Sequence, residues 1–125
     1  MKKCFLTQKG PKAIGPYSTA TIAGNCCFMS GMLGVNPETG KLAEGIEAQA
    51  EQAMKNVCTV LEEMGLTPAS VLKTTVFLAD LNDFAKVNAI YAEYFGPDYP
   101  SRSCVQVARL PMDALVEIEA IAAVE

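Results

Sequence analysis

A helical spacing of apolar residues across the middle of the chain constrains the fold more than any other feature. Between residues 46 and 64, apolar side chains recur every three to four positions and polar side chains fill the opposite side. The apolar face comprises Ile46, Ala50, Ala53, Met54, Val57, Cys58, Val60, Leu61 and Met64. Gly65 and Pro68 follow, as is typical of a helix end. We therefore predict an amphipathic helix over Ile46–Met64, with Cys58 as an unreactive thiol in its buried face.

Segments with the pattern of β-strands lie on both sides of this helix. In chain order the predicted strands are Tyr17–Ala23, Cys26–Ser30, Val71–Leu78, Ser103–Arg109 and Leu115–Val124. Turns are predicted at Gly24-Asn25 and Asn36–Gly40. A second helix is expected from a cap at Asp80 or Asn82 to Phe95. The order ββαβαββ, without repeats or linkers, predicts one α+β domain over residues 1–125 with both helices on one face of a sheet.

The chain contains no histidine, which limits the chemistry available to it. Ser-His-Asp and Cys-His nucleophile pairs are excluded, and so are histidine-based metal sites. The five cysteines are odd in number and show no CxxC spacing, so neither a disulfide framework nor a zinc site is indicated. We therefore expect no metal and no cofactor, and acid–base chemistry from carboxylates, Cys, Tyr, Lys, water or backbone groups.

Charge and hydropathy narrow the partners and the compartment. The formal net charge is −4 and no run of Lys or Arg appears, which argues against a nucleic-acid partner. No apolar run approaches the roughly 20 residues that a membrane-spanning helix needs. No signal peptide is visible and the thiols are free, so we expect a cytoplasmic protein and no membrane partner.

Asn88 interrupts the apolar stripe of the second predicted helix. Phe84, Val87, Tyr91 and Phe95 form that stripe, and Asn88 falls within it. A buried amide without a partner costs about 1–3 kcal/mol, so this side chain should have one. A purely structural bond, to backbone or to a neighbouring chain, is one reading, and a binding site is the other.

The last predicted strand has one apolar face and one mixed face. Val116, Ile118, Ala120, Ala122 and Val124 share the first, which should lie under the helices. Glu117 and Glu119 share the second with Leu115 and Ile121. In the preceding strand we expect the same division, with Val105 and Val107 on one face and Arg102, Cys104 and Gln106 on the other. A half-polar face is either solvated or covered by another subunit, and the aliphatic side chains favour a subunit interface.

Arg102 follows Pro100-Ser101 at the start of a strand. An arginine held there can present its planar guanidinium to a carboxylate through two parallel hydrogen bonds. A surface ion pair is the alternative. Together with Glu117 as a nearby acid, Arg102 suggests a pocket for a small organic anion, and the residues alone give no reaction.

Four groups of motifs resemble the RidA (YjgF-type) family of reactive-intermediate deaminases. They are Ala13–Ser18; Ser30-Gly31 with Asn36–Gly40; Lys73–Phe77 with Asp80–Phe84 and Val87-Asn88; and Pro100–Pro111 with Val116–Ala122. The resemblance spans nearly the whole chain. It implies a chorismate-mutase-like α+β fold with a mixed sheet. It also implies a homotrimer with a central barrel-like core and active sites in clefts between subunits.

The resemblance further implies an activity, the hydrolysis of 2-imino acids to 2-keto acids and ammonia. Arg102 would bind the substrate carboxylate, Glu117 would activate water, and Cys104 would line the pocket. Tyr17, Ser30, Gly31 and Asn88 would shape it. The sequence departs from the family pattern at Met32, Gly34, Thr19 and Gln106, which bears on the preferred imino-acid side chain. Non-catalytic binding of 2-keto acids or small amino acids is the alternative, and an RNA-directed translation inhibitor is a further one.

Overall fold

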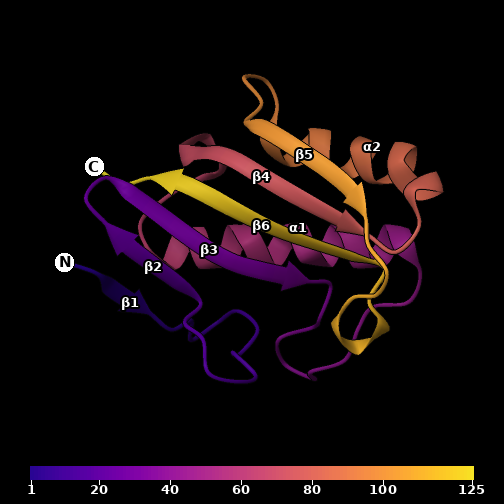
Figure 1. The fold of residues 1–125 in the computed structure, drawn as a ribbon, viewed down its shortest axis with the longest axis horizontal. Coiled ribbons are helices and arrows are strands. Elements are labelled where there is room, and N and C mark those ends of the chain that lie inside the picture. The colour runs from indigo at the N-terminus through magenta and orange to yellow at the C-terminus, as the bar shows by residue number, and fades with distance from the viewer.

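Six strands and two helices make up the computed structural model, which describes residues 1–125 (Figure 1). In chain order the elements are β1 Lys3–Phe5, β2 Ala20–Ala23, β3 Cys26–Leu33, α1 Ile46–Glu63, β4 Val71–Leu78, α2 Phe84–Phe95, β5 Ser101–Gln106 and β6 Val116–Ala123. Short 3-10 turns lie at Pro68–Ser70, Leu81–Asp83 and Pro111–Asp113. The α+β prediction is confirmed, and both predicted helices form.

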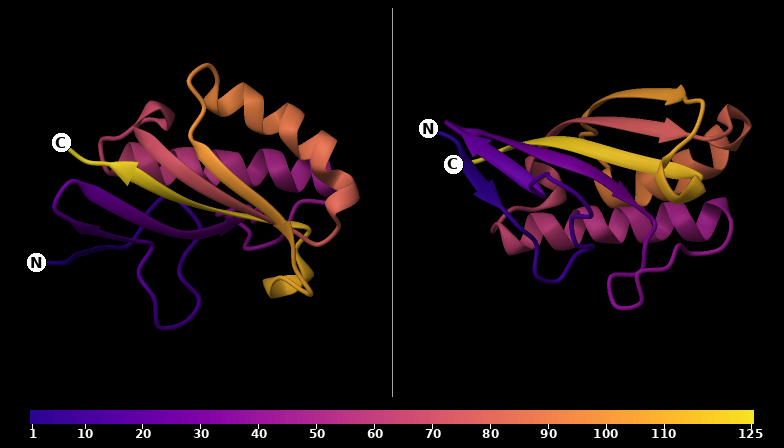
Figure 2. Two further views of the ribbon diagram at one scale, coloured as in Figure 1. Left: turned by 45° about the horizontal axis from the view of Figure 1, so that its top comes forward. Right: turned by 60° about the horizontal axis from the view of Figure 1, so that its bottom comes forward.

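All six strands join one mixed sheet in the order β1-β2-β3-β6-β4-β5. Only β4 and β5 are parallel, and α2 connects them as the crossover that parallel neighbours require. Both helices lie on the same side of the sheet (Figure 2), as the alternation in β6 predicted. Neither helix is both long and apolar enough to cross a membrane.

The core lies between α1, α2 and the helix side of the sheet. Val57, Leu61, Val76 and Ile118 are fully buried there, so the apolar faces predicted for α1 and for β6 do form the core. Cys58 differs from its prediction because it lies at the margin of this face and is partly exposed. Burial still raises its thiol pKa to about 11, with a smaller contribution from Glu62.

Four strands differ from the prediction by more than one residue. β2 begins at Ala20 instead of Tyr17, which lies in the preceding loop. β1 was not predicted, because three residues are too few to show an alternating pattern. β3 continues past Ser30 to Leu33 through a bulge at Ser30-Gly31, which shifts the register between Met29 and Met32 against β6. β5 begins at Ser101 and ends at Gln106, because its single partner β4 ends at Leu78, opposite Gln106.

The two faces of β5 are reversed relative to the expectation. Arg102 is in register with Thr74, and Cys104 with Val76, and both β4 residues are buried on the helix side. Val105 pairs with Phe77 instead and is exposed on the open face of the sheet. The polar set of β5 therefore faces the helices, and the valine faces the same way as Glu117.

Candidate active site

Arg102 lies at the start of β5, half-buried against α2. Its Nη1 donates a 2.7 Å hydrogen bond to Oδ1 of Asn88, one turn before Tyr91 on α2. The guanidinium carbon lies 4.8 Å from the centre of the Tyr91 ring and 5.4 Å from that of Phe84. Tyr91 is itself held by a 2.6 Å hydrogen bond to the hydroxyl of Thr74. Aromatic faces attract a cation, so these contacts fix the position of the guanidinium and leave its charge unneutralised.

No carboxylate pairs with Arg102. The one ion pair of the chain joins Arg109 to Asp113 on the surface, at 2.6 Å. Arg102 instead borders a cavity of about 410 Å³, whose lining comprises Asn88, Tyr91, Ala92, Tyr99, Pro100 and Arg102. A guanidinium has five N–H donors, and the bond to Asn88 occupies one of them. The remaining donors are available to an anion that enters this cavity.

Cys104 lies two residues further along β5, on the same face as Arg102. Burial raises the pKa of its thiol, and the nearby Arg102 charge opposes this only in part. The side chain is therefore a neutral thiol at neutral pH. A thiol that stays protonated is a poor nucleophile, so its position fits a lining role rather than covalent chemistry.

Glu117 lies on the open face of the sheet, directly over the backbone of Gly31. A methyl group at Gly31 would come within 2.6 Å of the Glu117 carboxyl carbon, so only glycine allows this approach. The carboxyl group makes no hydrogen bond within the chain, and it is half-buried. Burial raises the pKa of Glu117, and the charge of Glu119 raises it further. Such a carboxylate is poised to accept a proton closer to neutral pH than an ordinary glutamate.

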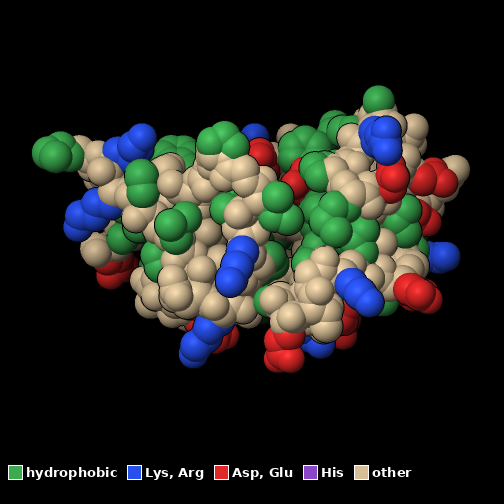
Figure 3. Space-filling model, turned by 90° about the horizontal axis from the view of Figure 1, so that it is seen from below, with side chains coloured by type: hydrophobic (Ala, Val, Ile, Leu, Met, Phe, Trp, Pro, Cys, Tyr) green, Lys and Arg blue, Asp and Glu red, His purple; other side chains and the backbone are tan.

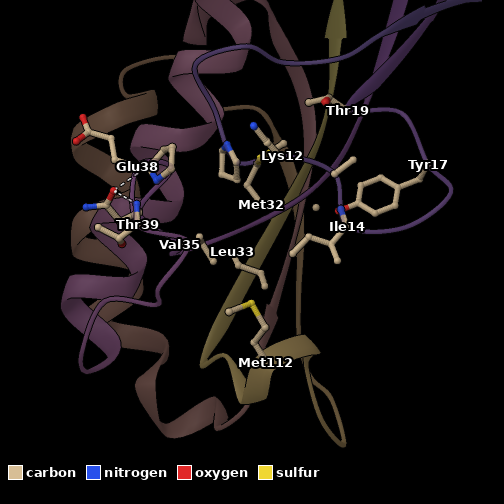
Figure 4. Close-up of a pocket in the computed structure, with 16 residues that line it drawn as sticks. Lys12, Ile14, Tyr17, Thr19, Met32, Leu33, Val35, Glu38, Thr39 and Met112 are labelled. Atoms are coloured by element: carbon tan, nitrogen blue, oxygen red, sulfur yellow. Dashed lines mark hydrogen bonds between the residues drawn. The ribbon is translucent and has the colours of Figure 1, made fainter.

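Ser30 and Tyr17 shape the surroundings of Gly31. The Ser30 hydroxyl donates a 2.7 Å bond to the carbonyl of Ser18, and its backbone N–H donates to the carbonyl of Thr19. These bonds tie the bulge in β3 to the loop that precedes β2. Tyr17 is half exposed on that loop, and its hydroxyl accepts a 3.3 Å hydrogen bond from the backbone N–H of Ile14. Tyr17 and Gly31 both border a second cavity, which Figure 4 shows in close-up.

The predicted site residues thus form two groups rather than one pocket. Arg102, Asn88 and Cys104 lie on the helix side of the sheet. Glu117 and Gly31 lie on the open side, because Glu117 pairs with Phe77 and Leu33. Within one chain, the sheet separates the cation from the acid, so the single pocket suggested by Arg102 and Glu117 alone does not form there.

Two aromatic residues beside Arg102 were not among the predicted site residues. Phe84 and Tyr91 belong to the same stripe of α2 that drew attention to Asn88, and that stripe was assigned to the core. Each lies one helical turn from Asn88, on either side of it, and this spacing was the available signal. Nowhere do three or more His, Cys, Asp or Glu side chains gather in an arrangement that could hold a metal ion.

The chain has close relatives of known sequence and structure. The family model described as Endoribonuclease L-PSP matches residues 7–124. A RutC family protein of Pyrococcus horikoshii is 49% identical over 123 residues, covering 98% of both chains. The 2-iminobutanoate/2-iminopropanoate deaminase of Escherichia coli K12 is 48% identical over 125 residues, also covering 98% of both.

Solved structures agree with these sequence matches. The crystal structure of E. coli TdcF with bound serine matches with a TM-score of 0.93 at 44% identity, covering 98% of this chain and 99% of that one. At this identity over nearly the full length, the shared fold reflects common descent. The chain belongs to the Endoribonuclease L-PSP family, which includes the RidA and YjgF-type proteins.

Proposed function

We propose that this protein hydrolyses 2-imino acids of the 2-iminobutanoate and 2-iminopropanoate type to 2-keto acids and ammonia. Relatives at 48% identity bear the name of this activity. The observation on which the proposal rests is the half-buried Arg102, which has no carboxylate partner and borders a cavity. A 2-imino acid offers the carboxylate that such a guanidinium binds through two parallel hydrogen bonds.

The site is proposed to form between two copies of the chain. One copy supplies Arg102 and Cys104 from the helix side of its β5 and Asn88 from its α2. The next copy supplies Glu117, Gly31, Ser30 and Tyr17. The separation of the two groups within one chain supports this arrangement. A homotrimer with a central barrel-like core, the assembly that the family resemblance implies, would bury the half-polar open face of the sheet.

The reaction requires no metal or cofactor on this proposal. A protonated imine next to a carboxylate has an electrophilic carbon, to which water can add. Ionised Glu117 would accept a proton from the attacking water, which gives a carbinolamine, and would return that proton to the nitrogen. As the C–N bond then breaks and ammonia leaves, Glu117 would take the proton of the hydroxyl group, whose oxygen becomes the keto oxygen. The chain's other contribution is orientation: Arg102 fixes the carboxylate, and positioning of this kind supplies up to roughly 7–11 kcal/mol in favourable cases. Cys104 would help to place the imine nitrogen or the water through its backbone.

Substitution of Arg102 tests the proposal. With imines generated in situ from amino acids, we expect Arg102→Ala to abolish turnover and Arg102→Lys to retain little, because lysine lacks the planar pair of donors. Arg109→Ala is the matched control, because Arg109 lies on the surface and pairs only with Asp113. Wild-type turnover in Arg102→Ala would overturn the assignment.

Glu117→Gln separates an enzyme from a binding protein. We expect this variant to bind a 2-keto acid with near wild-type affinity and to lose most of kcat. A protein that only senses 2-keto acids would show the binding and no imine hydrolysis in either form. Calorimetric titration beside the turnover assay distinguishes the two.

RNA cleavage is a second candidate, because the family description names it. The charge of the chain is unfavourable for it: the net charge is −4, and Figure 3 shows Lys and Arg interspersed with Asp and Glu on the face it displays. RNA binding that weakens steeply with salt, together with cleavage that is lost in Arg102→Ala, would favour this candidate over imine hydrolysis.

A further inference from the structure

A cavity beside Gly31, lined by 16 residues, is not used by the proposed chemistry. It has a volume of about 340 Å³ and lies between the loop that holds Lys12–Tyr17 and the loop that holds Val35–Gly40. Figure 4 shows Ile14 and Met112 approaching Leu33, at the end of β3, from two different loops. The volume falls at the lower end of the range for small-molecule pockets, roughly 300–1,000 Å³.

The lining of this cavity is mainly apolar. Ile14, Met32, Leu33, Val35 and Met112 contribute aliphatic or thioether side chains, and the two charged residues of the lining, Lys12 and Glu38, are both exposed. Met32 is almost fully buried, whereas Met112 is 49% exposed. Methionine side chains are flexible and polarizable, so they adapt to apolar groups of different shape.

The cavity shares two residues with the acid half of the candidate site. Gly31 and Tyr17 line it, and the Glu117 carboxyl group lies directly over Gly31. A substrate whose imine carbon lies close to the Glu117 carboxylate would therefore have its side chain close to the cavity. The ethyl or methyl group of the smallest 2-imino acids would leave most of this volume empty.

We infer that this cavity binds the side chain of the 2-imino acid. The site then hydrolyses the small imino acids and prefers those with long, unbranched or γ-branched apolar side chains, such as the imino acids derived from methionine and leucine. The inference rests on the proposed function and names its substrate class. Each methylene buried in an apolar pocket contributes about fourfold to binding, so kcat/KM should rise by about that factor per methylene until the cavity is filled.

Met112 should act as the rim of this subsite. Its backbone is held in the left-handed region at φ 60°, in a turn closed by the Arg109–Asp113 ion pair. This backbone conformation is unfavourable for any residue other than glycine, and such conformations concentrate at functional sites. A larger side chain at this position should narrow the cavity without disturbing the core, because Met112 is half exposed.

The test measures kcat/KM for imines generated in situ from alanine, 2-aminobutanoate, leucine and methionine. In the wild type we expect the leucine and methionine imines to be preferred over the alanine imine by at least tenfold. Met112→Trp should reduce that ratio at least tenfold. Leu72→Trp, which changes an exposed leucine that does not line the cavity, should leave the ratio within twofold.

The outcomes separate failure of the subsite from failure of the function. Hydrolysis of the alanine imine with no preference for longer side chains, or with a ratio unchanged in Met112→Trp, would overturn the subsite while the proposed function stands. If no imine is hydrolysed, the function fails, and titration with pyruvate and 4-methyl-2-oxopentanoate then tests the cavity alone. Tighter binding of the longer keto acid that is lost in Met112→Trp supports the subsite, and equal binding or none overturns it. Ile14→Trp, at a residue 80% exposed, replaces Met112→Trp if that variant does not fold.

Discussion

The protonation of Glu117 depends on two neighbours that the chain itself supplies. Burial beside Gly31 raises the pKa of its carboxyl group, and the charge of Glu119, two residues along β6, raises it further. Removing that second charge should lower the pKa. We therefore expect Glu119→Gln to move the titration of Glu117, followed by the ¹³C shift of its carboxyl carbon, to lower pH. An unchanged midpoint would show that the Glu119 charge is screened by solvent.

The same shift has a consequence for stability. Because the pKa of Glu117 is higher in the folded than in the unfolded chain, the folded state binds more protons between the two values, and stability falls as pH rises through that range. Glu117→Gln removes this cost. We expect the variant to melt at a higher temperature than the wild type at pH 7. The difference should vanish below about pH 4, where Glu117 is protonated in both the folded and the unfolded chain. Calorimetry at the two pH values is the measurement, and a lower melting temperature at pH 7 would mean that ionised Glu117 is stabilised by a partner.

Individual residues of the site were predictable where they broke a pattern. Asn88 was conspicuous as an amide within an apolar stripe, and the structure gives it Arg102 as a partner. Ser30 was expected to shape the pocket, and its hydroxyl is occupied by the Ser18 carbonyl. The difference is physical. A polar side chain within an apolar stripe must have a hydrogen-bond partner, so the pattern itself indicates a contact. The hydroxyl of a serine in a strand can bond to many different groups, so the sequence does not specify its partner.

Polar side chains of α1 tie that helix to the end of β3, next to the site. Asn56 is 1% exposed, and its amide donates hydrogen bonds of 2.9 and 2.8 Å to the carbonyls of Leu33 and Val35. We expect Asn56→Ala to lower the free energy of unfolding by about 1–3 kcal/mol, because it leaves buried carbonyls without donors. Asn56→Asp should cost more, because it turns a carboxylate towards those oxygens.

Chemical denaturation measures both Asn56 variants, with Lys55→Ala as the control. Lys55 is exposed on the same helix, and its substitution should change stability by no more than about 0.5 kcal/mol. Equal effects of Asn56→Ala and Lys55→Ala would show that the two carbonyls find other donors.

At the level of elements, the sequence predicts α1 to within one residue because 18 residues repeat one period on one face. It predicts β6 nearly as well. β5 was assigned to the wrong face, since alternation shows which residues share a face but not which face of the sheet that is. That choice depends on the parallel register with β4, a contact between segments about 28 residues apart (Thr74 and Arg102) that no local pattern records.

At the scale of the whole molecule, the open face of the sheet is poorly suited to water. Phe28 and Val105 are 48% and 43% exposed on it, beside Glu117 and Glu119. Arg102 lies on the edge strand β5 beside α2, whereas Glu117 lies on the open face of β6, an inner strand of the sheet. A second copy placed over the open face would bury these side chains and bring the two groups together, which no motion within one chain would do without breaking the sheet.

Mixed assemblies test whether two chains build each site. Arg102→Ala chains and Glu117→Gln chains should each be nearly inactive when expressed alone. The two are then co-expressed with different tags, and the mixed assemblies are purified through both tags. If each site takes Arg102 from one chain and Glu117 from its neighbour, every mixed trimer has one intact site out of three, and imine hydrolysis returns to about one third of wild type. Arg102→Ala chains mixed with chains that contain both substitutions have no intact site and should stay inactive. If the first mixture is confirmed to contain both chains and still recovers no activity, then Arg102 and Glu117 of the same chain would form each site, which contradicts their separation by the sheet.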